Sequence, residues 1–142
     1  MGGPVARHGF RWLVAGAERF AWSVGHAHEV AADADAPGGR RLTGCRELVR
    51  LRREGARGQL VVVFRDGDGN VASGGMLHAG AVMHADGRSL NLNEPGVVRA
   101  LLDEALARGW QPALPSRSEL DGWTLFDAVA ARRASSVGPT SA

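Results

Sequence analysis

Two runs of alternating apolar and polar residues stand at the start of the chain, at residues 10–14 and 20–24. Alternation with a period of two is typical of β-strands, and the short glycine-containing connection at 15–18 is typical of a hairpin. Aromatic side chains bury on the order of 150–250 Å² each, so the aromatic face of this hairpin should form a main part of the core. We therefore expect four rings on one buried face: Phe10, Trp12, Phe20 and Trp22.

The next stretch contains one loop and one ambiguous segment. Residues 31–41 combine Ala, Asp, Pro and Gly without periodicity, which predicts a surface loop. Residues 43–54 fit either a capped helix that ends at Gly55 or a strand. We favour the strand, because it turns Val49 and Leu51 inward and gives the strongly β-prone segment 59–65 an antiparallel partner. The helix stays open as the alternative.

The middle of the chain is rich in glycine. Residues 66–89 contain several turn signals, and they could cover a pocket. One or two short strands are expected around 76–83 and 89–92. The sequence Asp66–Asn70 superficially resembles the start of a calcium loop, but Leu77 stands where a bidentate glutamate is required, so we interpret it as a turn.

A well-marked helix is predicted at residues 93–109. Asn93 suits the N-cap and Gly109 suits the position just after the last turn. Val98, Leu101, Leu102 and Leu106 share one face at helical spacing, and we expect this face to pack on the sheet. Further on, the pattern fits either a short strand at 123–126 or a second helix that begins at Ser118.

These elements predict an α+β fold. We expect a small antiparallel sheet of hairpins, with about four to six strands, and one main helix from the C-terminal half packed on one face. A chain of 142 residues is long enough for one self-sufficient core, so residues 1–142 are expected to form a single domain. The ordered part should run approximately from 9 to 134, between short flexible termini.

Composition limits the setting in which the protein works. All 17 basic residues are arginine, which is typical of codon bias in a GC-rich bacterial genome. The single cysteine, Cys45, excludes an intrachain disulfide and favours a reducing compartment. The apolar run at 60–64 is far shorter than a membrane span, and no signal peptide is visible. We expect a cytoplasmic protein with no membrane partner.

The histidines are the candidates for catalytic chemistry. His26 and His28 would project from the same face of a strand, and His78 or His84 could complete a three-ligand zinc site. This spacing is more typical of exposed histidines at a strand end, so the small metal-dependent enzyme is kept only as an alternative. Neither a phosphate-binding loop nor a dinucleotide fingerprint is present, and we expect no cofactor and no catalytic residue.

Positive charge is concentrated in one segment, because residues 40–65 carry eight arginines and two acidic residues. Read as a strand, this segment places arginines on its outward face. We therefore expect a non-enzymatic interaction module, an accessory, immunity-type or assembly protein, that binds an acidic protein partner. Sequence-nonspecific nucleic-acid binding is the alternative function of the same patch. The predicted patch comprises Arg46, Arg50, Arg52, Arg53 and Arg57.

Overall fold

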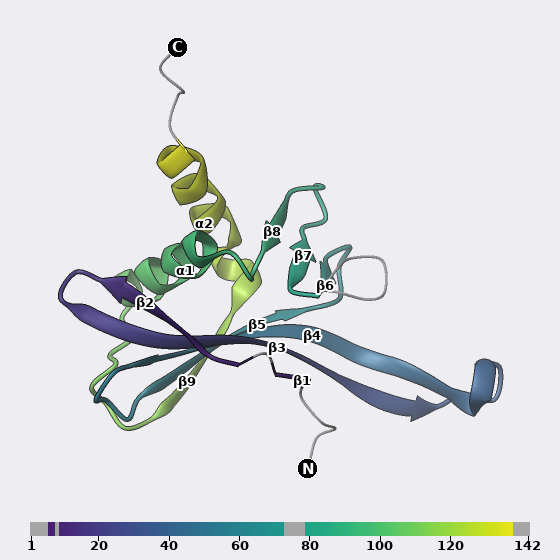
Figure 1. Cartoon of the computed structure of the whole chain (residues 1–142). Helices are drawn as coiled ribbons and strands as arrows, with labels where there is room; N and C mark the ends of the chain where they lie inside the picture. Colours follow the sequence, from purple (N-terminus) through teal and green to yellow (C-terminus); the bar gives the residue numbers. More distant parts are fainter. Residues whose placement is uncertain (1–5, 8, 73–78, 138–142) are drawn as a thin grey trace.

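A long twisted hairpin organises the computed structural model, which describes residues 6–7, 9–72 and 79–137. Strands β3 (Glu18–Ala32) and β4 (Arg40–Arg53) pair antiparallel along almost their whole length. Figure 1 shows them extending beyond the rest of the molecule as an arm, with the short helix η1 (Pro37–Gly39) at its tip. The loop expected at 31–41 is therefore shorter than predicted, because the strands continue to Ala32 and resume at Arg40.

The predicted first hairpin is confirmed. Strand β2 (Arg11–Ala15) pairs with the first half of β3, and β1 (Ala6–Arg7) pairs further along the same edge of β3. Ala15 lies opposite Glu18, so the turn holds only two residues, and Gly16 adopts a φ of 65° there. A positive φ at the first turn position is typical of tight hairpins and favours glycine.

The ambiguous segment 43–54 is a strand, and the helical alternative is wrong. Strand β4 pairs antiparallel with β5 (Gln59–Arg65), as predicted, and Val49 and Leu51 are buried on the inward face. The far edge of the sheet differs from the expectation. Strand β9 (Arg117–Asp121) joins β5 in parallel, so the six-stranded sheet is mixed.

Three short strands form a second, antiparallel sheet: β6 (Val71–Ala72), β7 (Ala81–Met83) and β8 (Ser89–Asn91). Short strands were predicted near 76–83 and 89–92, although residues 73–78 lie outside the described part of the chain. Asp66 accepts a hydrogen bond from the Ala72 N–H, and Gly67 and Asn70 form an isolated bridge. The stretch that superficially resembles a calcium loop is thus a turn.

Two helices follow. Helix α1 (Pro95–Ala107) is the predicted one, but its N-cap residue is Glu94. Asn93 instead donates its side-chain amide to the Ala79 carbonyl at 2.9 Å, so the N-cap role predicted for it is wrong. At the other end, Gly109 adopts a φ of 104° and the Trp110 N–H bonds back to the Ala105 carbonyl at 3.0 Å, which satisfies a free carbonyl of the last turn.

Helix α2 (Gly122–Val137) begins directly after β9, where Asp121 accepts a hydrogen bond from the Trp123 N–H at 3.0 Å. Neither alternative predicted for this region was right, because a strand and a helix both occur and the helix begins at Gly122. Among the described residues, neither helix is long and apolar enough to cross a lipid bilayer. The flexible termini expected from the sequence fall largely outside those residues.

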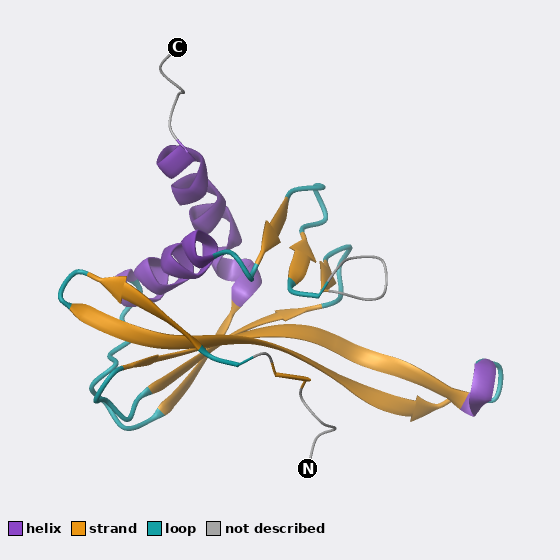
Figure 2. Cartoon of the chain, viewed as in Figure 1, coloured by secondary structure: helices purple, strands orange, loops and turns teal. Residues whose placement is uncertain are grey.

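Both helices and the β6–β8 sheet lie on the same side of the six-stranded sheet, as Figure 2 shows. The main core fills the space between them, so the α+β class predicted from the sequence is confirmed. Leu106 is 38% exposed, which makes its predicted place in the core wrong. The largest buried side chains are contributed by the sheet and by both helices: Phe20, Trp22, Leu51, Leu60, Phe64, Leu101, Leu102, Leu125 and Phe126.

Candidate binding face of the sheet

Alternation along β4 and β5 separates two faces of the sheet. Val49, Leu60 and Val62 face the helices and belong to the main core. On the opposite side, Leu48 and Val61 belong to a small separate apolar cluster. We call this opposite side the arginine face, because three arginines of β4 alternate with the inward residues and lie on it: Arg46, Arg50 and Arg52.

Arginine side chains also help to cover this face. Arg50 is the cross-strand neighbour of Val61, whose side chain is fully buried although no described helix lies on this side. Long arginine stems cover apolar surface while the guanidinium reaches water. Arg50 is only partly exposed and stands beside the small apolar cluster, whereas Arg52 at the end of the row is exposed to solvent.

The structure brings together only part of the predicted patch. Arg46, Arg50 and Arg52 share the arginine face, and the exposed Arg57 lies in the β4–β5 turn. Arg53 lies on the helix side, next to Phe20, and its guanidinium is 3.4 Å from a carboxylate oxygen of Glu18. Arg53 is therefore on the wrong side of the sheet to act with the other four arginines.

Two aromatic residues predicted to be core lie on the arginine face instead. Trp12 is 45% exposed and Phe10 is 64% exposed, and their rings contact edge to face with centroids 5.6 Å apart. The pairing of β2 with β3 explains the error. Trp12 lies opposite Ala21, which in turn lies opposite Arg52, so these three residues form one row across three strands.

An additional arginine completes this corner. The guanidinium carbon of Arg19 lies 4.2 Å from the centroid of the Trp12 ring, a cation–π contact, and Arg19 also pairs with Glu54 at 3.0 Å. Arg19 was not among the predicted binding residues, because it stands outside the arginine-rich segment. The signal that could have identified Arg19 was its position directly after the turn, in a hairpin with alternating apolar and polar residues.

A shallow groove of about 390 Å³ runs across this corner of the arginine face. The guanidinium of Arg52 makes no ion pair with any residue in the described ranges, so its charge is available to a ligand. The arrangement offers aromatic surface, positive charge and an amide group to a ligand. The residues at its floor and rim include Phe10, Trp12, Ala21, Ser23, Arg50, Arg52 and Gln59.

The candidate metal ligands fall into two separate places. His26 and His28 lie together on β3 with ring centroids 5.3 Å apart, as the sequence predicted. His84 lies at the β7–β8 turn, where its ring packs 5.1 Å from that of Phe126. His78 lies outside the described residues. Within those residues, no group of three or more His, Cys, Asp or Glu side chains is arranged to hold a metal ion.

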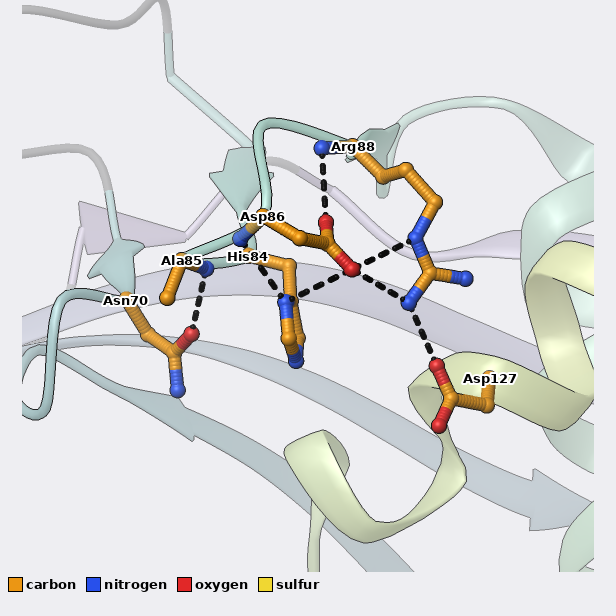
Figure 3. A network of polar contacts seen from close by, with 6 residues as sticks. All are labelled: Asn70, His84, Ala85, Asp86, Arg88 and Asp127. Carbon is orange, nitrogen blue, oxygen red and sulfur yellow. Dashed lines mark hydrogen bonds and ion pairs between the residues drawn. The ribbon is translucent and has the colours of Figure 1, made fainter.

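Figure 3 shows the surroundings of His84, which are a polar network between the β7–β8 turn and α2. Arg88 bonds to Asp86 at 2.7 Å and to Asp127 of α2 at 2.5 Å, and His84 lies 3.2 Å from Asp86. The hydrogen bonds from Arg88 lower the pKa of Asp86 to about 2, and the two carboxylates raise the pKa of Arg88. These groups satisfy one another, and the network anchors the small sheet to the helix.

Cys45 does not have the environment of a reactive thiol. Its side chain is half-buried, and burial followed by the negative charge of Asp66 raises its pKa. A raised pKa keeps the thiol protonated, and the protonated form is a poor nucleophile.

Comparisons with family models, with curated proteins and with solved structures find no match for this chain.

Proposed function

We propose that this protein is a non-enzymatic interaction module that holds an acidic protein partner on the arginine face of its sheet, in the cytoplasm. The observation that carries the proposal is the row formed by Trp12 and Arg52 on either side of Ala21. The exposed indole and the Arg52 guanidinium, which makes no ion pair within the described part of the chain, both line the same groove.

The residue types of the groove support a protein partner. Tryptophan and arginine are enriched among the residues that contribute most binding energy at protein interfaces, because each combines a large apolar surface with a polar group. Complementary charge also steers the approach of an acidic partner and speeds its association. The groove offers both contributions within one corner of the arginine face.

The distribution of charge distinguishes a protein partner from a long nucleic acid. Strand β9 carries Glu119 and Asp121 at alternate positions, beside Val61 and Val63 of the arginine face, and Arg65 lies 3.8 Å from Glu119. A phosphate backbone is negative along its whole length and favours an uninterrupted basic track. A face with both signs of charge suits a protein surface, which also carries both.

Single-stranded nucleic acid is the second candidate, and one observation favours it. Trp12 is exposed, with Phe10 against its edge and Arg19 over its ring. Bases stack on exposed aromatic side chains beside arginines without sequence preference. A short strand that contacts only this corner would avoid the acidic residues of β9.

The test compares two substitutions at adjacent positions of β4. Arg52→Glu reverses a charge in the groove, whereas Arg53→Glu makes the same change on the helix side of the strand. Wild-type and both variant proteins are immobilised at low salt and exposed to lysate with and without nuclease, and separately to a labelled single-stranded oligonucleotide. Circular dichroism confirms that each variant is folded.

We expect the wild-type protein to retain an acidic protein after nuclease treatment. The Arg52→Glu variant should lose this protein, and the Arg53→Glu variant should keep it. Binding of the oligonucleotide with the same pattern, together with loss of retained protein after nuclease, would replace the leading proposal by the second candidate. If both variants retain the same ligands as the wild-type protein, the arginine face is not a binding surface.

A further inference from the structure

A second group of polar residues lies where the β3–β4 arm leaves the sheet. His26 on β3 is the cross-strand partner of Glu47 on β4, and its Nδ1 lies 3.1 Å from Glu47 Oε1. The Glu47 side chain is almost fully buried, and it is the one buried charged residue among the described residues. A carboxylate in such a place requires a hydrogen-bond donor, and His26 supplies one.

This contact sets the tautomer of His26. An ionised carboxylate only accepts hydrogen bonds, so the proton of a neutral His26 ring resides on Nδ1. The Nε2 atom then presents a lone pair away from Glu47. Histidines that bind metals in proteins commonly have this arrangement, in which one ring nitrogen donates to a carboxylate and the other binds the metal.

The second histidine is placed to share a ligand with the first. Nδ1 of His28 lies 3.3 Å from Nε2 of His26. Two imidazole nitrogens that each bind a tetrahedral Zn²⁺ at about 2.0–2.1 Å are roughly 3.3 Å apart, so the observed separation matches that of two ligands of one ion. Without metal, His28 donates its Nδ1 proton to His26. When the ion binds, that proton moves to Nε2 of His28, and both nitrogens keep lone pairs for the metal.

We infer that His26 Nε2 and His28 Nδ1 bind one divalent transition-metal ion of the Zn²⁺ type, with Glu47 positioning His26 and water completing the coordination. Imidazole nitrogen is a preferred ligand of such ions, whereas Mg²⁺ and Ca²⁺ prefer oxygen. The site is independent of the arginine face, because His26 faces the opposite side of β3 from Ala21, which lines the groove.

Zn²⁺ alone is the probe in the test, which uses the full chain without a histidine tag and isothermal titration calorimetry. The wild-type protein should bind one ion per chain. His28→Ala should weaken binding more than about tenfold, and Glu47→Gln should weaken it about 10–100-fold, since loss of a carboxylate partner typically has an effect of that size. His84→Ala is the matched control. His84 also lies 3.2 Å from a carboxylate, but its ring packs against Phe126, so its loss should leave the affinity for Zn²⁺ unchanged.

Nuclear magnetic resonance of the histidine ring nitrogens supplies a second measurement that needs no variant. Zn²⁺ should shift the Nε2 signal of His26 and the Nδ1 signal of His28, and leave the signals of His84 in place. Equal affinity of the wild-type and His28→Ala proteins would overturn the inference. Shifts of the His84 ring nitrogens that match or exceed those at His26 would also overturn the inference. This measurement uses the wild-type protein, so it decides the question even if Glu47→Gln fails to fold.

Discussion

Trp12 and Trp22 lie on neighbouring strands of one hairpin but on opposite faces of the sheet, because Trp12 is the cross-strand partner of Ala21. Trp22 is 2% exposed and belongs to the main core, whereas Trp12 is 45% exposed and lines the groove. Directly opposed residues of an antiparallel pair point to the same face. With a two-residue turn, an even-numbered residue is always opposite an odd-numbered one, so two even-numbered tryptophans are separated.

The two tryptophans should therefore respond differently to the same substitution. Trp22→Ala removes a fully buried ring and should lower the free energy of unfolding by about 3–5 kcal/mol. Trp12→Ala removes an exposed ring with one cation–π contact and should cost about 1 kcal/mol or less. Urea denaturation followed by circular dichroism measures both. Equal losses of stability would contradict the assignment of Trp12 to the arginine face.

For the bound partner, the two arginine variants give a quantitative expectation. Arg52→Glu should weaken binding at low salt by about tenfold or more, because it places a negative charge in the groove that we propose holds an acidic partner. Arg53→Glu should change affinity less than threefold, because its guanidinium lies on the other face beside Glu18. Repeating the wild-type titration at higher salt should reduce affinity, since exposed charges are screened over about 8–10 Å.

Gly122 should tolerate no side chain. A Cβ atom at this position would lie 2.5 Å from ring atoms of the fully buried Phe64, so Gly122→Ala forces the ring or the start of α2 to move. We expect a loss of about 1–3 kcal/mol in the free energy of unfolding. Gly9→Ala is the control, since a Cβ atom there meets nothing within 4 Å, and it should be nearly neutral. A neutral Gly122→Ala would show that the helix start is less tightly packed than described.

The network in Figure 3 predicts how stability depends on pH. The pKa of Asp86 is lowered from 3.8 to about 2 in the folded protein, chiefly by hydrogen bonds from Arg88. A folded-state pKa below the unfolded value stabilises the protein above about pH 3.8, and this contribution is lost as the pH falls towards 2. Asp86→Asn should therefore be less stable than the wild-type protein at pH 6. The difference should shrink towards pH 2 in matched denaturation curves, and a constant difference would contradict the argument.

Local patterns in the sequence were sufficient for most of the secondary structure. The alternation at residues 10–24 predicted the first hairpin, and the β-prone segment at 59–65 predicted a partner strand at 43–54. The helix and its end at Gly109 were predicted for the same reason, because capping and positive φ depend on residues close in sequence. Such features need no knowledge of distant parts of the chain.

The faces of the strands were decided by turn length. The sequence does not show whether two or three residues form the turn before Glu18, yet this choice determines whether Trp12 is buried or exposed. A change of one residue in the length of the turn moves every side chain of a strand to the other face of the sheet. The exposure of Trp12 and the position of Arg53 behind the groove became apparent only in the folded structure.

The sequence by itself determined the class of fold, the long helix and the concentration of arginines on β4, since propensity and alternation act over a few residues. Tertiary structure alone decided the parallel pairing of β9 with β5 and the contact of His26 with Glu47, residues 21 positions apart. Both depend on which strands become neighbours and in what register. That choice is made by burial of the whole core, which no local pattern encodes.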